Sequence, residues 1–352
     1  MDTSLVTERD AAAVLDAART RIRPVLRETV EALPSAMRLA AGYHFGWHDP
    51  EGRPVAEPSA MGKTLRPALV FLAAAAVTGT TPVSGADDTV VRAAVAVELV
   101  HNFTLIHDDV IDQDALRRHR ETVWKVFGVP SAILAGDALL ALATQVLAKA
   151  ATPMAAKGIT VVHDCVQELI EGQAADLSFE TRNDVRLTEC VAMAGRKTGA
   201  LMSCACALGA LLGGADQEQV GRLRAFGMHF GLAFQLADDL LGIWGDPGIT
   251  GKPARSDLLS RKKSLPVVAA LNSDTEAALE LSAMYRKPQA WDHTEVRHAQ
   301  TLLERAGART WTLQEAARQA ASALACLDSA GLDPAAAADL TTLTHLAATR
   351  ER

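Results

Sequence analysis

The chain has 352 residues, of which 49% are apolar and 4% aromatic, and its formal net charge is −7. That length allows one large domain or two ordinary ones, and basic residues scattered among acids argue against a nucleic-acid-binding protein. Five cysteines without CxxC spacing suit a reducing compartment, and the N-terminal segment lacks the apolar centre of a secretory signal. We therefore expect a globular, cytoplasmic protein.

Helical periodicity recurs along the whole chain, and no alternating strand pattern stands out. The expected helices cover residues 10–32, 67–77, 87–112, 131–151, 158–179, 188–213, 216–244, 264–284, 295–306, 312–329 and 335–349. Two breaks, residues 42–63 and 245–263, are long and rich in Gly, Pro and charge, as functional loops often are. We predict an all-α protein with a single domain over 1–352, which begins with a helical region over 1–40.

One uncharged run, residues 198–215, just reaches the length of a membrane span. Arg196 and Lys197 precede this run within the same expected helix, and glycines loosen it. A buried core helix explains these features better, so we expect no membrane span.

The segment HNFTLIHDDVID, residues 101–112, places three aspartates at the end of an apolar helix. Asp108 and Asp112 lie one turn apart on one face, and Asp109 flanks them. Carboxylates this close tolerate one another best around a hard divalent cation, and oxygen ligands alone favour magnesium over zinc. A single motif of this kind, however, more often marks an acidic helix end that faces water.

A second acidic pair strengthens the metal hypothesis. Asp238 and Asp239 in GLAFQLADDLLGIWGD also follow an apolar helix, with Gln235 on the same face. Two such helices can face each other across a bundle and hold magnesium ions between them. Because magnesium held in this way keeps water ligands and binds phosphate oxygens, we predict a diphosphate ligand.

Basic residues occur where a diphosphate would need them. In GKTLRP, Lys63 and Arg66 stand three apart at a helix entrance, where backbone N–H groups are available to an anion. Arg117 and Arg118 follow the first acidic motif closely. Each of these features alone is ordinary, and their combination favours an anion site.

Further lysines lie near the second acidic pair. Lys197 and Thr198 lie within an apolar helix, where an unpaired lysine is costly, so a buried phosphate and a partner carboxylate are equally good explanations. The loop GKPARSDLLSRKKSLP carries Lys252, Lys262 and Lys263, which are either ligands of an anion or part of a solvated charged loop.

With these motifs in this order, the chain resembles the trans-isoprenyl diphosphate synthases, the head-to-tail prenyltransferases, from about Lys63 to the C-terminal helices. The resemblance rests on GKTLRP, ELVHNFTLIHDDVIDQDALRR, AGDALL, EGQAADL, GRKTGAL, FQLADDLLGIWGD and GKPARSDLLSRKKSLP. It implies a helical bundle of the isoprenoid synthase type, with a central cavity between the acidic helices. It also implies a homodimer and three magnesium ions.

The resemblance implies a role for each matching position. The residues implied to bind magnesium are Asp108, Asp109, Asp112, Asp238 and Asp239. Those implied to neutralise the allylic diphosphate are Arg117, Lys197, Lys252 and Lys262. Those implied to bind isopentenyl diphosphate are Lys63, Arg66, His101 and Arg118. Thr198 and Gln235 would line the reacting centre and complete a catalytic group with Lys197.

The chain departs from the family's pattern at three places. Gly242 stands where many relatives carry the third acid of the second motif, and Asp246 lies too far along the chain to replace it. Because two carboxylates suffice for one magnesium with waters, we expect activity to survive. His119 and Trp124 stand where relatives often have Gly and His, which affects the contacts expected around isopentenyl diphosphate.

Phe103 and Thr104, five and four residues before Asp108, bear on product length. Thr104 lies one turn below Asp108 and Phe103 is rotated away, so helix geometry alone does not decide which one blocks the product. One aromatic at the fifth position resembles geranylgeranyl (C20) diphosphate synthases, and Phe103 as a core residue is the simpler alternative. Farnesyl (C15) or longer products, a terpene cyclase and a regulatory subunit remain the other candidates.

Overall fold

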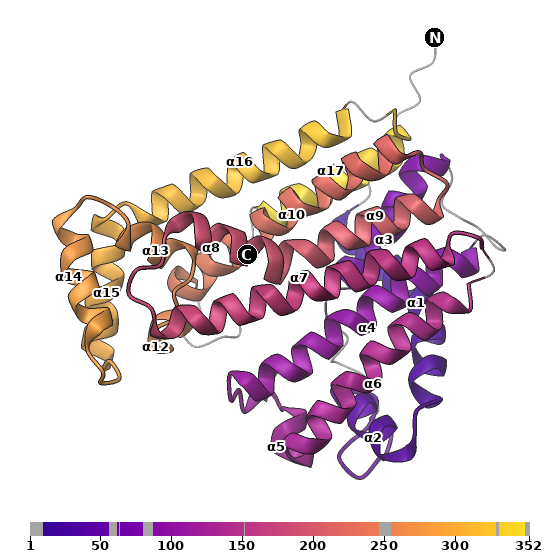
Figure 1. Ribbon diagram of the computed structural model, residues 1–352, viewed down its shortest axis with the longest axis horizontal. Coiled ribbons are helices and arrows are strands. Elements are labelled where there is room, and N and C mark those ends of the chain that lie inside the picture. The colour runs from indigo at the N-terminus through magenta and orange to yellow at the C-terminus, as the bar shows by residue number, and fades with distance from the viewer. Residues whose placement is uncertain are drawn as a thin grey trace. The chain divides into compact units, whose positions relative to one another are not determined.

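The computed structural model describes residues 10–55, 62, 64–79, 87–150, 152–245, 255–328 and 331–348. Lys63 and Lys252, two of the expected substrate-binding residues, lie outside the described residues, as does Asp246. The described part is almost entirely helical, which confirms the predicted all-α class (Figure 1).

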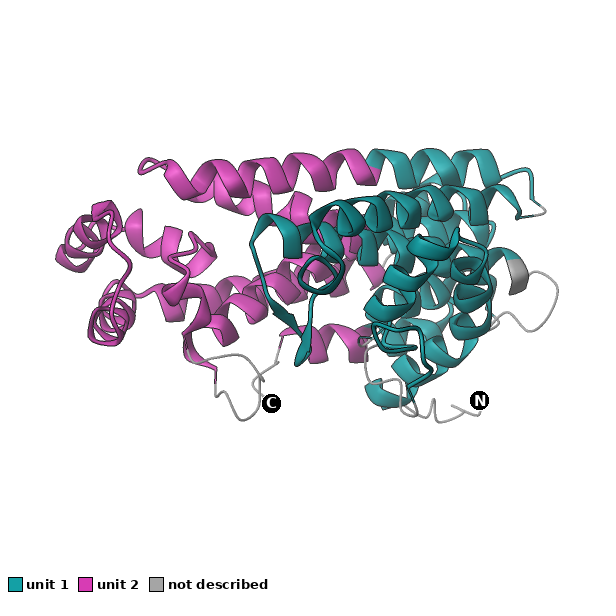
Figure 2. Ribbon diagram, turned by 90° about the horizontal axis from the view of Figure 1, so that it is seen from below, with its two compact units in different colours: residues 1–164, 204–224, 332–340 teal, residues 165–203, 225–331, 341–352 magenta. Residues whose placement is uncertain are grey.

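The described residues group into two compact units, coloured separately in Figure 2. Unit 1 comprises residues 1–164, 204–224 and 332–340, and unit 2 comprises residues 165–203, 225–331 and 341–352. Most of these boundaries fall inside a helix rather than in a linker. The single domain over 1–352 therefore stays a prediction.

Unit 1 is built around the helix that ends in the first acidic motif. Its elements are α1 (Ala11–Glu31), α2 (Ser35–His44), α3 (Leu65–Thr78), α4 (Asp87–Ile111), β1 (Leu116–Arg117), β2 (Arg120–Glu121), α5 (Val123–Phe127) and α6 (Val129–Ala148). The helices α1, α3, α5 and α6 all contact α4. A helix that is apolar on most of its faces is stable when other helices enclose it, and α4 is buried nearly completely between Val90 and Ile106.

Unit 2 holds the remaining elements, four of which continue into unit 1. The continuing helices are α7 (Ala155–Thr181), α9 (Ala200–Leu212), α10 (Gln217–Trp244) and α17 (Pro334–Ala348). The others are α8 (Leu187–Ala194), the π-helical turn η1 (Gly195–Gly199), α12 (Ser256–Leu259), α13 (Leu265–Leu271), α14 (Glu276–Arg286), α15 (His293–Arg305) and α16 (Ala308–Asp328).

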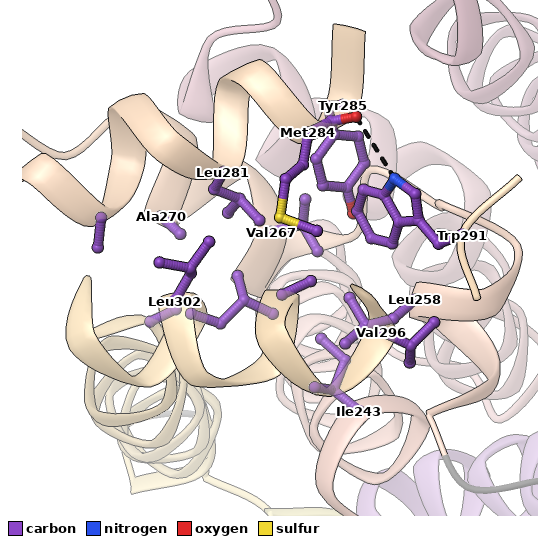
Figure 3. Packing of buried hydrophobic residues seen from close by; sticks show 14 residues of the cluster. Ile243, Leu258, Val267, Ala270, Leu281, Met284, Tyr285, Trp291, Val296 and Leu302 are labelled. Atoms are coloured by element: carbon purple, nitrogen blue, oxygen red, sulfur yellow. Dashed lines mark hydrogen bonds between the residues drawn. The ribbon is translucent and has the colours of Figure 1, made fainter. Parts of the chain in front are cut away.

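One apolar cluster of unit 2 joins the end of α10 to the segments that follow it (Figure 3). Ile243 of α10 and Leu258 of α12 are buried in it together with Tyr285 and Trp291, whose rings meet edge to face at 4.9 Å. The Trp291 indole donates to the backbone oxygen of Met284 at 3.4 Å, the dashed line of Figure 3. The cluster thus fixes α12 against the last turns of α10.

The expected helices need three refinements. The helix expected over 188–213 contains the π-helical turn at 195–199, and the helix expected over 264–284 ends at Leu271 and restarts at Glu276. Thr275 explains the restart, because its side chain accepts a hydrogen bond from the Ala278 amide as an N-cap. The short helices α5 and α12 and the β1–β2 hairpin are absent from the prediction, and only the first part of α2 falls within the helical region expected over 1–40.

Two helices among the described residues, Thr89–Ile111 and Val129–Ala148, are long and apolar enough to cross a membrane by length and composition alone. The structure buries 72% of the first apolar window and 44% of the second. Core helices pass the same test, so the finding is weak support for a membrane span.

Gly209 allows α9 and α3 to approach closely within unit 1. A Cβ atom on Gly209 would lie 2.2 Å from the backbone oxygen of Val70. We therefore expect Gly209→Ala to lower the free energy of unfolding by about 1–3 kcal/mol, because overpacking must separate the helices. Gly221→Ala in α10 is the control, since no atom lies within 4 Å of its added Cβ. Gly221→Ala should instead raise the free energy of unfolding by about 0.4–1 kcal/mol, because alanine reduces the conformational entropy of the unfolded chain. Urea unfolding measures both, and equal changes would contradict the close approach.

Candidate active site

The first acidic motif lies at the end of α4 in unit 1. Asp108 is half-buried, Asp112 is exposed, and Asp109 is only 1% exposed. Arg117 of β1 places its Nε and Nη2 atoms 2.7 Å from Oδ1 of Asp109, whereas Oδ2 of Asp109 has no hydrogen-bond partner among the described residues. Burial raises the pKa of Asp109, although Arg117 opposes the shift. An interior carboxylate oxygen without a partner is costly, and a bound cation would satisfy it.

The surroundings of Asp109 fit a magnesium ion that binds mainly water and phosphate. A cavity of about 20 Å³, room for roughly one water molecule, lies between Asp109, Arg117, Arg118 and His44. Within the described ranges, no three His, Cys, Asp or Glu side chains are placed to hold a metal by themselves. Magnesium often needs only one or two carboxylates when substrate phosphates supply further oxygens.

Residues implied to bind isopentenyl diphosphate come together beside this motif in unit 1. Arg66 of α3 donates from Nη1 to Nε2 of His101 at 3.2 Å. Because arginine can only donate, this ring nitrogen accepts and the imidazole is neutral. Burial and then Arg66 lower the pKa of His101 well below its usual value. Gly62 of GKTLRP lies against Arg118, whose Nη2 would be 2.7 Å from a Cβ at position 62.

A buried polar chain beneath this group escaped the sequence analysis. His44 of α2 bonds Oδ1 of Asn102 at 2.9 Å, and Asn102 donates to the Glu98 side chain at 3.1 Å and to its backbone oxygen at 2.7 Å. Burial raises the pKa of Glu98, although Arg66 opposes this. The spacing of Glu98, His101 and Asn102 on one helix was a usable signal, but His44 lies far away in sequence.

The hairpin that carries Arg117 and Arg118 has an uncommon turn. Arg118 and His119 have φ angles of 52° and 63°, a left-handed conformation that two-residue hairpin turns require and that usually selects Asn or Gly. Holding two such residues is a cost of order 1 kcal/mol each. Trp124 supports the loop, because its indole donates to the Asp114 backbone oxygen at 2.8 Å.

The two residues expected to set product length are placed differently on α4. Phe103 is 7% exposed and meets the His107 ring edge to face at 5.3 Å. Nε2 of His107 forms a hydrogen bond with the Ile133 backbone oxygen of α6 at 3.0 Å. Gly136 makes room for the His107 ring, because a Cβ atom at position 136 would lie 2.2 Å from Nε2 of His107. The Thr104 hydroxyl donates to the backbone oxygen of His101 at 2.7 Å. Phe103 therefore packs on the side of α4 that faces α6.

In unit 2, a carboxylate is the partner of Lys197. The Lys197 ammonium lies 2.5 Å from Oδ2 of Asp176 on α7, and both side chains are largely buried. Gly172 brings α7 this close, because a Cβ there would lie 2.5 Å from the Lys197 backbone nitrogen. Asp176 and Gly172 both belong to EGQAADL, a motif whose individual residues the sequence analysis left without roles.

Thr198, Gln235 and Asp239 form one hydrogen-bonded chain in unit 2. The Thr198 hydroxyl donates to Oε1 of Gln235 at 2.6 Å, and Nε2 of Gln235 donates to Oδ1 of Asp239 at 2.6 Å. Oδ2 of Asp239 accepts from the Leu265 amide at 3.0 Å. Asp239 thus caps α13 from a neighbouring helix, while its sequence neighbour Asp238 stays half-buried.

Asp239 is the most perturbed acid of this group. Burial raises its pKa to about 7, the charge of Lys262 opposes the shift, and the charge of Asp257 adds to it. The adjacent Lys263 has a structural role, because its ammonium donates to the backbone oxygens of Phe179 and Glu180 at 2.6 and 3.1 Å, and also to that of Arg182. These carbonyls close the C-terminus of α7, where a cation is favoured. Of the two adjacent lysines, Lys262 is the one whose charge acts on Asp239.

The chain matches one family model, described as polyprenyl synthetase, over residues 54–303. The chain belongs to the polyprenyl synthetase family. It is 44% identical over 342 residues to a (2E,6E)-farnesyl diphosphate synthase of Mycobacterium tuberculosis, covering 96% of this chain and 93% of the relative. It is also 44% identical over 344 residues to a geranylgeranyl diphosphate synthase of the same species, covering 96% and 94%.

Solved structures agree with this assignment. A polyprenyl synthetase from Streptomyces coelicolor A3(2) superposes with a TM-score of 0.90 at 44% identity, covering 96% of this chain and 99% of that one. A geranylgeranyl pyrophosphate synthase from Corynebacterium glutamicum, complexed with isoprenyl diphosphate and magnesium, gives 0.83 at 25% identity, covering 98% and 100%. The expected resemblance is confirmed, and the protein is a prenyltransferase of the isoprenoid diphosphate synthases.

His44 should make folding stability depend on pH. Burial lowers its pKa from 6.5 to about 3, and Arg118 adds to the shift. Below pH 6.5 the unfolded chain binds a proton that the folded chain does not, so stability falls toward pH 3, by at most about 1.4 kcal/mol per pH unit. His44→Gln keeps a donor for Asn102 and should lose less stability between pH 7 and 4.5. Urea unfolding across this range measures the difference, and parallel curves for the two proteins would refute it.

Proposed function

We propose that the protein is a magnesium-dependent synthase that condenses isopentenyl diphosphate with an allylic prenyl diphosphate, head to tail. The observation that carries the proposal is Asp109, a buried carboxylate with one oxygen bound by Arg117 and the other without a partner in the part of the chain that the structure describes. The acidic pair at the end of α10, in unit 2, is proposed to bind magnesium as well. The family resemblance implies a central cavity between the acidic helices, and that cavity is proposed on the resemblance alone.

Five aspartates are the proposed magnesium ligands, and three ions per site is the number that the family resemblance implies. The proposed ligands are Asp108, Asp109, Asp112, Asp238 and Asp239. When bound there, magnesium would neutralise the diphosphate oxygens and so favour departure of pyrophosphate.

The proposed cationic residues divide between the two substrates. Arg117, Lys197, Lys252 and Lys262 would neutralise the allylic diphosphate, whereas Lys63, Arg66, His101 and Arg118 would bind the diphosphate of isopentenyl diphosphate. The Arg66–His101 contact supports the second group, because a neutral imidazole can keep donating from its other ring nitrogen to a phosphate oxygen. The Lys197 ammonium forms an ion pair with Asp176, and a bound diphosphate would compete with that carboxylate for the ammonium.

The proposed reaction breaks the bond between the allylic C1 and its diphosphate oxygen, and pyrophosphate leaves with the electron pair. The double bond of isopentenyl diphosphate attacks the resulting allylic cation, a new carbon–carbon bond forms, and the departing pyrophosphate accepts the proton that is lost. Thr198 and Gln235, hydrogen-bonded to each other, are proposed to line this centre with Lys197. A preorganised dipolar chain can stabilise a cation without reorganisation.

The proposed main product is the C20 diphosphate. The single aromatic Phe103 beside the smaller Thr104 supports it, although the two relatives of equal identity carry C15 and C20 names. Partners are the two diphosphate substrates and a second copy of the chain in a homodimer, and the proposed location is the cytoplasm. A terpene cyclase is disfavoured by the Arg66–His101 pair, because a cyclase has no second diphosphate to bind.

Removal of the Asp109 charge should abolish synthesis. Purified protein with magnesium, labelled isopentenyl diphosphate and C5, C10 or C15 allylic diphosphate should form a longer diphosphate. Asp109→Asn should lower kcat/KM at least about a hundredfold, because it removes a proposed ligand of the magnesium that would neutralise the departing diphosphate. Asp164→Asn, which makes the same change on the exposed face of α7, should have no effect. Hydrocarbon formed from a single prenyl diphosphate would instead point to a cyclase.

Product length tests the role of Phe103. If Phe103 limits chain growth, Phe103→Leu should shift products beyond C20, and Thr104→Phe should shift them to C15. If Phe103 only packs against His107, Phe103→Leu should lower the free energy of unfolding by roughly 1 kcal/mol and leave product lengths unchanged. Chromatography of dephosphorylated products, together with thermal unfolding of each variant, distinguishes the two roles.

A further inference from the structure

Residues 43–55, the described start of the long break at 42–63, have no role in the proposed reaction, yet they form a compact turn. The rings of Phe45 and Trp47 are buried and stack with their centroids 4.8 Å apart. The Val55 amide donates to the Trp47 backbone oxygen at 3.1 Å. We call residues 43–55 the α2 turn, since they begin in the last turn of α2.

The α2 turn binds β2, the second strand of the hairpin. The Tyr43 hydroxyl donates to the Glu121 backbone oxygen at 2.9 Å. Arg120 donates from Nη1 to the Tyr43 backbone oxygen at 3.0 Å and from Nη2 to the His48 backbone oxygen at 3.3 Å. The guanidinium also lies over the Tyr43 ring, 4.3 Å from its centroid, and this ring meets Phe127 of α5 edge to face at 5.4 Å. Tyr43 and Arg120 thus join the hairpin to α2.

The hairpin needs such support from outside. Its strands, Leu116–Arg117 and Arg120–Glu121, have two residues each, and even larger isolated hairpins are only marginally stable in water. Its turn residues Arg118 and His119 are both left-handed, a conformation that persists in such residues only where surrounding contacts hold it. Arg120 follows this turn directly and supplies contacts of that kind.

The supported turn carries Arg118, which is proposed to bind isopentenyl diphosphate. Arg118 reaches the GKTLRP segment, where a Cβ atom on Gly62 would lie 2.7 Å from its Nη2 atom. Arg117 has a separate anchor, because its Nε and Nη2 atoms both lie 2.7 Å from Oδ1 of the buried Asp109. Loss of the α2 contacts should therefore displace Arg118 more than Arg117.

The α2 turn is also tied to the helix that carries His101. His44 forms a hydrogen bond with Oδ1 of Asn102 at 2.9 Å, and Asn102 directly follows His101 on α4. The α2 turn thus contacts both elements, α4 and the hairpin, from which His101 and Arg118 come. A fixed distance between these two side chains is what a diphosphate that binds both would require.

Stability alone explains this arrangement less well. Tyr43 and Arg120 line the same cavity of about 20 Å³ as Arg118 and Asp109. A shift of either side chain would therefore change the space beside the proposed substrate-binding residues. The buried rings of Phe45 and Trp47 could hold the α2 turn in place without any contact to the hairpin.

We infer that Tyr43 and Arg120 are positioning residues for isopentenyl diphosphate, which hold the hairpin so that Arg118 meets the diphosphate. The inference rests on the proposed function. It gives the start of the 42–63 break a role in affinity for the second substrate, exerted through Arg118.

Binding of isopentenyl diphosphate to the purified full-length protein, measured by calorimetry without turnover, tests the role of Tyr43. Tyr43→Phe removes the hydroxyl, keeps the ring and changes no charge. It should weaken binding about threefold to tenfold, the range expected for loss of one hydrogen bond. In the condensation assay, the KM of the allylic diphosphate should stay within twofold, because Asp109 holds Arg117 independently. A role in stability alone would leave binding by the folded protein unchanged.

Arg38→Gln is the control for a change on the same helix. Arg38 is exposed on α2 and donates to the Glu31 backbone oxygen at 3.4 Å, away from the hairpin. This variant should bind isopentenyl diphosphate as the original protein does.

Variants of Arg120 separate geometry from charge. Arg120→Lys keeps the positive charge but lacks the planar fork that reaches two carbonyl oxygens, so it should also weaken binding about threefold or more. If Arg120→Lys binds as the original protein does and only Arg120→Gln binds more weakly, charge alone explains the effect and the positioning role is refuted.

A double variant tests whether Tyr43 acts through Arg118. Arg118→Gln alone should weaken binding of isopentenyl diphosphate. Addition of Tyr43→Phe to Arg118→Gln should weaken it by less than a further twofold, because two residues that act through one contact are not additive. If the two effects multiply, Tyr43 acts elsewhere and the inference is wrong.

The outcomes separate this inference from the proposed function. If the original protein does not bind isopentenyl diphosphate, the proposed function fails and the inference fails with it. If the original protein binds and condenses isopentenyl diphosphate, and Tyr43→Phe binds it within twofold, only the positioning role is refuted.

Discussion

Burial of acids at the ends of apolar helices is the constraint on which the site depends. The helix α4 is enclosed by α1, α3, α5 and α6, and one acid at the end of each acidic helix is buried, Asp109 on α4 and Asp239 on α10. An ionised carboxylate in such a place needs a compensating charge or hydrogen-bond donors. Arg117 donates a hydrogen bond to Asp109. Gln235 and the Leu265 amide donate hydrogen bonds to Asp239, and the charge of Lys262 favours its ionised form.

Close backbone packing places the remaining polar groups of unit 2. A Cβ on Gly172 would meet the backbone of Lys197, and a Cβ on Gly231 would lie 2.6 Å from the Cα of Gly199. The π-helical turn at 195–199 therefore lies between α7 and α10 with no side chain to separate them. This packing explains why Lys197 reaches Asp176 and Thr198 reaches Gln235 from adjacent positions of one turn. π-Helical turns of this kind are common at functional sites.

Sequence patterns over short distances along the chain predicted the helical class and the local motifs of this protein. Helical class, the acidic motifs and the basic residues near them follow from periodicity and spacing, which local physics determines. Asp176 as the partner of Lys197 and His44 beside Asn102 depend on residues far apart in sequence, so no pattern could pair them. The hairpin at 116–121 was missed for a different reason, since Arg118 and His119 are not the residues that its turn normally selects.

The buried aspartates of the two acidic helices differ in how many of their carboxylate oxygens already accept hydrogen bonds. Within the described ranges, one oxygen of Asp109 has no hydrogen-bond partner, whereas both oxygens of Asp239 accept hydrogen bonds, one from Gln235 and one from the Leu265 amide. Each Asp239 oxygen has a second lone pair, but a ligand must approach it past groups that already fix its position. Asp239 is therefore suited to orient its neighbours, and the less buried Asp238 is the more accessible ligand from α10.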